Sequence, residues 1–141
     1  QTSFCVGARV NPGARDPEAE IARARAKVRA GAHFLVSRPV YELDSLLRMV
    51  TALEGTDVPL LLSVTPLHSF EEADYLANEV PGVTIPPDTL RAMERAGPGA
   101  ARAAGIDLAA CLLHEARKLV SGVIVTAAED DPAGLAPLLA S

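Results

Sequence analysis

The stretch that decides the fold covers residues 27–41 and reads KVRAGAHFLVSRPVY. It is typical of the end of a helix, a glycine turn at Gly31 and a short apolar strand over 34–37. This order is the repeating unit of an α/β fold, and the chain contains roughly four copies of it. In a closed parallel barrel, the residue just past the carboxyl end of a strand faces the active site. Arg38 holds that position here, so it is the first candidate site residue.

The composition predicts one domain over residues 1–141, with 49% hydrophobic residues to form its core. A net charge of −5 argues against a nucleic-acid or anionic membrane surface, because both require basic patches. Cys5 and Cys111 fit no metal or redox spacing, and we interpret them as buried free thiols in a reducing cytoplasm. No membrane-spanning run and no signal peptide are visible. The chain begins at Gln1 and reads as a piece of something longer.

Turn residues and apolar runs together predict the element order. The expected strands cover 3–10, 34–37, 58–64 and 122–126. The expected helices begin at the Asp16-Pro17 pair, at a cap on Asp44, at a Ser69/Glu72 capping box, near Thr89, after a break at Gly97, and at Asp131-Pro132.

Four strand–helix units of this kind are half of an eight-stranded barrel, with parallel strands and right-handed crossovers. An open sheet of the flavodoxin type is the structural alternative. Against it, the loop after the first strand lacks the G-x-G-x-x-G spacing of a phosphate loop.

Several blocks of the sequence resemble one family, in the family's order. They are VGARVNP (6–12), KVRAGAHF (27–34), VTPLHSFEEADYLANEVPGVTIP (64–86) and the tail GIDLA…SGVIVT (105–126). The chain resembles methylenetetrahydrofolate reductase, particularly the form fused behind a homocysteine S-methyltransferase. The blocks correspond to strands five to eight of the family's barrel. The expected fold is therefore the second half of a TIM (β/α)8 barrel.

The resemblance implies an activity and its cofactors. The family is FAD-dependent and passes a hydride from NAD(P)H through the flavin to 5,10-methylenetetrahydrofolate, giving 5-methyltetrahydrofolate. It therefore implies a flavoprotein oxidoreductase of one-carbon metabolism and methionine biosynthesis, with FAD, NAD(P)H and a folate as ligands.

The resemblance also implies roles for individual residues. Lys27 matches a lysine that contacts FAD, Glu20 matches an acidic residue serving the same cofactor, and Asn11 is assigned beside them. Seven residues along a helix place Glu20 and Lys27 on one side, about 10 Å apart along the axis. The alternative for these two is an exposed charge pair on a helix rich in charged residues.

Two further residues are assigned to the folate side of the pocket. Phe70 matches an aromatic residue there, although a hydrophobic residue at a helix start looks the same. His68 follows the third strand and is a candidate proton donor, although loop histidines usually face solvent.

Two positions depart from the family pattern. Ser37-Arg38 stands where the family has Thr-Gln, and Ala128-Glu129 stands where it has Asn-Arg. These swaps change the hydrogen-bond pattern offered to substrate, because arginine has no acceptor and an ionised glutamate has no donor. Arg38 and Glu129, both on the substrate side, are predicted to pair with each other across the barrel mouth.

Two hypotheses follow from these observations. In the first, the chain is the closing half of an oxidoreductase; its general acid belongs to the family's first strand, so no catalytic residue and no metal site are assigned here. In the second, the chain is a catalytically silent half-barrel that acts as a scaffold. Both predict pairing with a complementary N-terminal half-barrel or a second copy, because a half-barrel exposes two sheet edges and an apolar interior.

Overall fold

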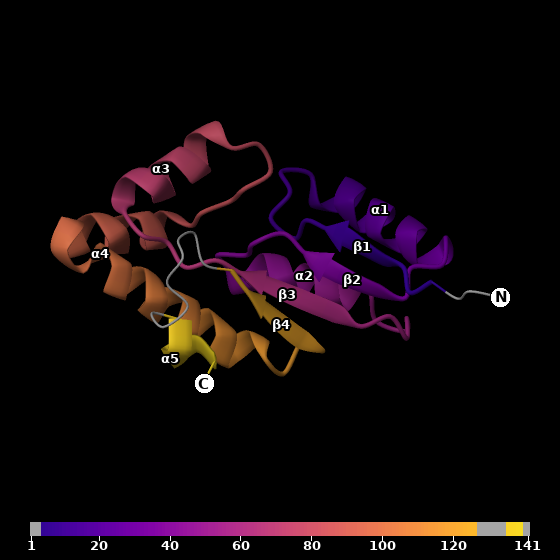
Figure 1. The fold of residues 1–141 in the computed structure, drawn as a ribbon. Coiled ribbons are helices and arrows are strands. Elements are labelled where there is room, and N and C mark those ends of the chain that lie inside the picture. Colours follow the sequence, from indigo (N-terminus) through magenta and orange to yellow (C-terminus); the bar gives the residue numbers. More distant parts are fainter. Residues whose placement is uncertain (1–3, 127–134, 140–141) are drawn as a thin grey trace.

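Four parallel strands form a single sheet in the order β1-β2-β3-β4 (Figure 1). The computed structural model describes residues 4–126 and 135–139 of the chain. The strands are β1 Gly7–Val10, β2 Phe34–Ser37, β3 Leu60–Val64 and β4 Gly122–Val125. The strand order follows the chain without the reversal that defines a flavodoxin-type sheet, so that alternative is wrong. A sheet of four sequential parallel strands is consistent with part of a TIM-type barrel.

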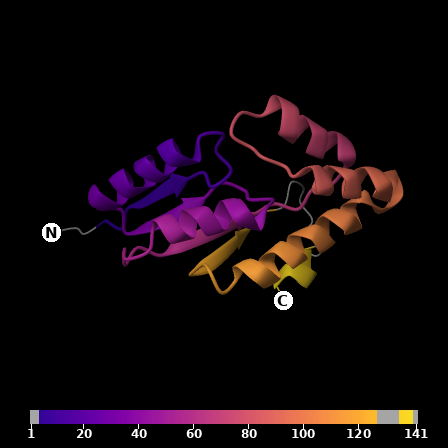
Figure 2. The same cartoon turned by 180° about the vertical axis from the view of Figure 1, so that it is seen from behind.

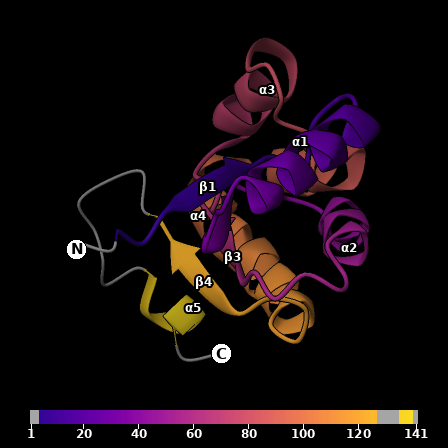
Figure 3. The ribbon, with the colours of Figure 1, turned by 90° about the vertical axis from the view of Figure 1, so that its right-hand side faces the viewer.

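Three helices cover one face of this sheet. The helices are α1 Pro17–Arg29, α2 Leu43–Ala52, α3 Phe70–Glu79, α4 Pro87–Ala116 and α5 Ala136–Leu139. Figure 2 shows α1, α2 and α4 in front of the strands, and Figure 3 shows α1 and α2 on the same side of the sheet. Helix α3 packs on α4 instead of on the strands. Among the helices in the described ranges, none is long and apolar enough to cross a membrane.

The helix starts follow the predicted chemistry at two of three caps. The Asp16 carboxylate accepts from the amide of Ala19 at 3.0 Å, and the Ser69 hydroxyl accepts from the amide of Glu72 at 3.0 Å. The predicted cap at Asp44 is wrong. Glu42 takes the extended cap conformation without a side-chain bond, and α2 begins one residue before Asp44.

The covered face of the sheet carries the main core. Its strand residues alternate along each strand, as expected when every second side chain points to the same face. The strand residues Val10, Leu35, Leu62 and Val64 pack with Ala24 of α1, with Leu46 and Met49 of α2, and with Ala109, Leu113 and Ala116 of α4.

The opposite face, here called the open face, carries the other half of each strand. Its residues are Gly7, Arg9, Phe34, Val36, Leu61, Ser63, Gly122 and Ile124. The Phe34 ring occupies the space where a Cβ on Gly7 would lie, and Leu61 lies beside Gly122 in the same way. Ile124 is 40% exposed. This face is largely apolar and no helix of the described ranges packs on it.

Helix α4 contains the predicted break. Gly97 has φ 65° and ψ 174°, which kinks the helix, and the helix ends at Ala116. Beyond the kink, α4 approaches the loop after β3 very closely, because a Cβ on Gly105 would lie 1.8 Å from the carbonyl oxygen of Leu67. Only glycine permits this contact, so Gly105 sets the position of α4 on the sheet.

Two other expectations are corrected. The first strand begins at Gly7 and not at residue 3, because the register with β2 starts there and Phe4 is 80% exposed. Both cysteines are exposed and not buried. Cys5 precedes the sheet, and Cys111 lies about 200° around α4 from the buried Ala109, on the outer side of that helix.

Candidate functional site

An open hollow of about 440 Å³ lies at the carboxyl ends of β1 and β2. It is lined by Arg9, Val10, Asn11, Glu20, Lys27, Arg38 and Pro39. We call it the β1 hollow. It brings together the three predicted cofactor residues and Arg38, which come from two strand ends and one helix. Carboxyl-end positions of this kind carry the ligands of parallel α/β proteins.

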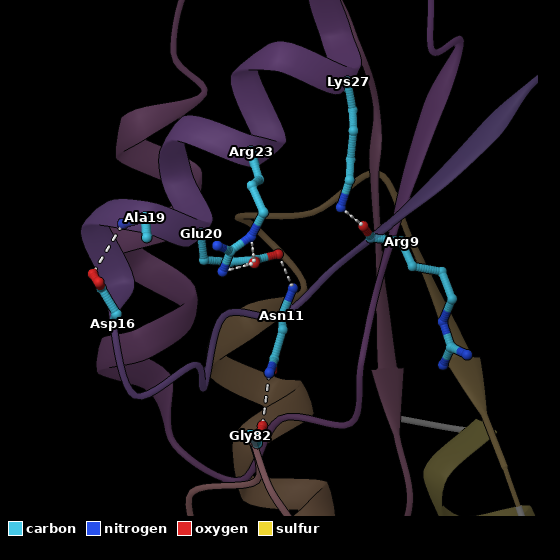
Figure 4. Close-up of polar contacts among 8 residues, drawn as sticks. All are labelled: Arg9, Asn11, Asp16, Ala19, Glu20, Arg23, Lys27 and Gly82. Carbon is cyan, nitrogen blue, oxygen red and sulfur yellow. Dashed lines mark hydrogen bonds and ion pairs between the residues drawn. The ribbon is translucent and has the colours of Figure 1, made fainter.

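Glu20 is buried and both of its carboxylate oxygens are engaged (Figure 4). Oε1 accepts from the amide of Asn11 at 2.9 Å, and Oε2 accepts from Arg23 Nε at 2.9 Å, with Arg23 Nη2 at 2.8 Å. This is not an exposed charge pair. Glu20 fixes the loop that leaves β1 and has its charge neutralised by Arg23.

Lys27 reaches from α1 to the backbone of β1, where its Nζ donates to the carbonyl oxygen of Arg9 at 2.6 Å (Figure 4). The carbonyls of Val6 and Val10 accept from the amides of His33 and Arg38, the residues just before and just after β2. Because carbonyls alternate sides along a strand, the Arg9 carbonyl points to the edge of β1 that has no partner strand. Glu20 binds the Asn11 amide on the same edge. Both predicted cofactor residues therefore hold backbone groups of the free edge.

The loop 81–84 contacts Asn11 and Arg38, two of the residues that line the β1 hollow. Asn11 Nδ2 donates to the carbonyl of Gly82 at 2.7 Å, and the Thr84 hydroxyl donates to the carbonyl of Gly13 at 2.8 Å. Gly82 has φ 78°, and a Cβ there would lie 2.8 Å from Asn11 Nδ2. Glycine is thus required at position 82 both by its left-handed backbone and by the approach of Asn11.

Arg38 extends from the end of β2 toward the same loop. Its Nη1 lies 3.5 Å from the carbonyl of Pro81, a long contact that leaves most of its donors available. The residue predicted to pair with it, Glu129, lies outside the described residues. With Glu20 neutralised, the charges lining the hollow are those of Arg9, Lys27 and Arg38, and such a cluster favours an anionic ligand.

His68 and Phe70 lie at the end of β3, apart from the β1 hollow. The backbone amide of His68 donates to Glu72 Oε2 at 2.7 Å, and its Nδ1 lies 3.3 Å from the same oxygen. Phe70 begins α3 and lines a separate hollow of about 230 Å³ together with Glu71, Glu94 and Pro98. The structure therefore divides the predicted site residues into two groups.

Tyr41 is a polar residue that the sequence reasoning missed. Burial, and then the nearby Glu72 carboxylate, raise the pKa of Tyr41 to about 12. Its hydroxyl is therefore protonated at neutral pH and can donate a hydrogen bond. It lines an apolar cavity of about 50 Å³ with Leu67 and Gly105. The signal available was its place in the loop that follows β2, three residues after Arg38.

Within residues 4–126 and 135–139, no group of three or more His, Cys, Asp or Glu side chains is arranged to hold an ion.

The chain is similar to known proteins in its sequence and in its fold. The family model of methylenetetrahydrofolate reductase matches residues 3–126. A solved structure is described as an uncharacterized protein from Clostridium thermocellum that binds two copies of 5-methyl-5,6,7,8-tetrahydrofolic acid. It is similar with a TM-score of 0.71 at 13% sequence identity, over 97% of this chain and 52% of that one. The chain thus spans about half the length of that protein. Among curated proteins, no match is found.

Proposed function

The chain belongs to the methylenetetrahydrofolate reductase family, and from this premise we propose that it forms strands five to eight of a (β/α)8 barrel whose mouth binds folate and flavin. The observation that carries the proposal is the gathering of Asn11, Glu20, Lys27 and Arg38 around one hollow at the carboxyl ends of β1 and β2. The folate named in the description of the structural neighbour supports the same ligand class.

The proposed reaction is the reduction of 5,10-methylenetetrahydrofolate to 5-methyltetrahydrofolate with NAD(P)H, as a cytoplasmic step of one-carbon metabolism that supplies methionine biosynthesis. FAD, when bound, carries the hydride between the two substrates. The general acid is supplied by the complementary N-terminal half-barrel.

The residues of the β1 hollow fit part of a dinucleotide. The Lys27 ammonium and the Arg38 guanidinium are the groups that would hold its phosphates, since both are donors only and both are cationic. Glu20 acts as a positioning residue, because its two oxygens already bind Asn11 and Arg23. Glu20 therefore holds the Asn11 loop against the ligand.

The residues at the end of β3 form the folate side of the proposed mouth. Phe70 would offer an aromatic surface for a flat ring, and His68, whose Nδ1 lies 3.3 Å from Glu72 Oε2, is the proposed group for moving a proton on this side. Arg38 and Glu129 replace the family's amide and cation, so substrate contacts there differ from the family pattern. Arg38 can donate to a carbonyl or carboxylate of the folate but cannot accept from it.

A second candidate function is a silent half-barrel that serves as a scaffold. The observation that favours it is that Lys27 and Glu20 are both occupied by backbone groups of β1. In this case the two residues protect the strand edge and bind no cofactor.

Ligand titration of the purified chain, alone and with a complementary half-barrel, separates the two functions. We expect Lys27→Met to weaken FAD binding by roughly tenfold or more, the usual cost of losing a charged hydrogen bond. The matched control is Lys118→Met, which removes the only other lysine of the chain from an exposed site past α4. Flavin fluorescence reports binding of FAD, and calorimetry reports binding of 5-methyltetrahydrofolate. If neither FAD nor 5-methyltetrahydrofolate binds, whether the chain is alone or with the complementary half-barrel, the result contradicts the enzyme function and supports the scaffold function.

A further inference from the structure

Helix α3 presents an aromatic ring among acidic side chains to solvent. The helix packs on α4 and not on the strands, and Figure 1 shows it standing apart from the sheet. Its exposed residues are Glu71, Asp74, Tyr75, Asn78 and Glu79, which helical spacing places on one side. Tyr75 is 59% exposed. We call this side the outer face of α3. It carries three carboxylates and no cation.

An open groove of about 540 Å³ lies between α1 and α2. Its lining includes Glu18, Ile21, Arg25, Leu47, Arg48 and Ala52. Arg25 Nε donates to the carbonyl of Ala52 at 2.9 Å, which holds this guanidinium between the two helices. Arg48 makes one long ion pair, at 3.8 Å, with Glu42. Among the described residues, both arginines therefore keep N–H groups for a further partner. We call this feature the α1/α2 groove.

The apolar parts of the two surfaces match each other. A covered tyrosine ring buries roughly 150–250 Å², and Ile21 and Leu47 offer apolar surface to cover it. The Tyr75 hydroxyl can donate to the carboxylate of Glu18, which lines the same groove. Tyrosine and arginine are enriched among the residues that dominate binding energy at protein interfaces. The groove therefore suits a tyrosine side chain presented by a helix.

The charges of the two surfaces are opposite. Glu71 and Glu79 lie one turn before and one turn after Tyr75, each about 6 Å from it along the helix axis. A helix that placed Tyr75 in the groove would bring these carboxylates to Arg25 and Arg48, and such pairs are commonly bidentate. Tyr75 is exposed within its own chain, so the contact forms between copies. Because one chain carries both surfaces, a second copy supplies the partner for each.

We propose that the outer face of α3 of one copy docks in the α1/α2 groove of another copy, with Tyr75 between the two helices and its flanking carboxylates paired with the two arginines. Because the two surfaces differ, a two-fold axis forms the contact twice and closes the pair into a dimer. The contact uses no residue that lines the β1 hollow, so it does not depend on the proposed function.

Two variants that each remove one surface test the proposal. Tyr75→Ala removes the ring, and Leu47→Glu places a carboxylate in the groove, so each should associate at least tenfold more weakly than the wild type in sedimentation velocity. Their equimolar mixture unites an intact groove with an intact α3. We expect it to associate at least tenfold more tightly than either variant alone. Leu139→Glu is the matched control, because it makes the same change at a leucine that is 73% exposed on α5, and it should associate as the wild type does.

The ion pairs are tested by a change that adds no charge. Glu71→Gln with Glu79→Gln should weaken association by roughly tenfold and remove most of its dependence on salt. The control is Asp107→Asn with Glu115→Gln, which makes the same loss of charge at exposed positions of α4. Circular dichroism checks that every variant is folded. The proposal is overturned if the wild type stays monomeric, if Tyr75→Ala associates as tightly as the wild type, or if the mixture is no tighter than its components.

Discussion

The two faces of the sheet come from the same four strands but differ in burial. On the covered face, Leu35 and Leu62 are fully buried under α1, α2 and α4. On the open face, Ile124 is 40% exposed and Arg9 lies among apolar neighbours. Within the described residues, helices cover one face only. The difference teaches that the packing that stabilises the fold is concentrated on the covered face.

The largest expected loss of stability comes from a substitution at the closest contact on the covered face. In Gly105→Ala, the added Cβ meets the Leu67 carbonyl at 1.8 Å, so α4 must shift away from the sheet. We expect a loss of about 4 kcal/mol or more in the free energy of unfolding, measured by urea denaturation. Gly99→Ala is the control, because no atom lies within 4 Å of its Cβ. It should leave stability unchanged or raise it slightly; equal losses for the two variants would contradict the packing described.

The next prediction compares the loss of stability caused by one substitution on each face. Leu62→Ala empties a fully buried site on the covered face and should cost about 3 kcal/mol. Ile124→Ala shortens a partly exposed side chain on the open face and should cost less than about 1 kcal/mol. Thermal and urea unfolding of both variants measure the difference. If Ile124→Ala proved as costly as Leu62→Ala, the open face would already be covered in the isolated chain.

A somewhat smaller effect than that of Leu62→Ala is expected from the ionisation of Tyr41 at high pH. The Tyr41 pKa is raised from 10.0 to about 12, so the unfolded chain loses this proton at lower pH than the folded chain. The stability from the buried phenol is therefore complete below pH 10 and is lost as the pH rises from 10 to about 12. The total loss should be about 2 to 3 kcal/mol.

A tyrosine pair gives this pH test its control. The chain has two tyrosines, and Tyr75 is 59% exposed on α3. Tyr75→Phe leaves Tyr41 as the only tyrosine, and adding Tyr41→Phe removes it. Urea unfolding of the two proteins between pH 9 and pH 12 should diverge only above pH 10. Parallel curves would show that Tyr41 ionises without cost in the folded protein.

Much of the fold follows from local sequence signals. Asp16 and Ser69 cap their helices as predicted, and Gly97 breaks α4, because these effects depend on residues close in the chain. The errors at Asp44 and Cys111 arise where tertiary packing decides. Leu46 of α2 is buried in the core with strand residues, and the close approach of Gly105 to Leu67 fixes which side of α4 lies inward.

The grouping of some candidate residues follows from the sequence, whereas their contacts do not. Helical spacing places Glu20 and Lys27 on one side of α1, and that follows from the sequence alone. Their binding to the edge of β1 depends on which edge of the sheet is free, which spacing does not reveal. The loop 81–84 and Tyr41 were missed for the same reason, since their partners lie far away in the sequence.

The two hydrogen bonds between the loop after β1 and the loop 81–84 have a consequence for the synthesis of the chain. Asn11 to Gly82 and Thr84 to Gly13 are each 71 residues apart. The loop leaving β1 therefore has no anchor on that side until the ribosome has released residue 84, long after β1 itself emerges. Contacts this distant close slowly. The contacts between the loop after β1 and the loop 81–84 are therefore completed late in folding, and the end of β1 stays without them while the first half of the chain emerges.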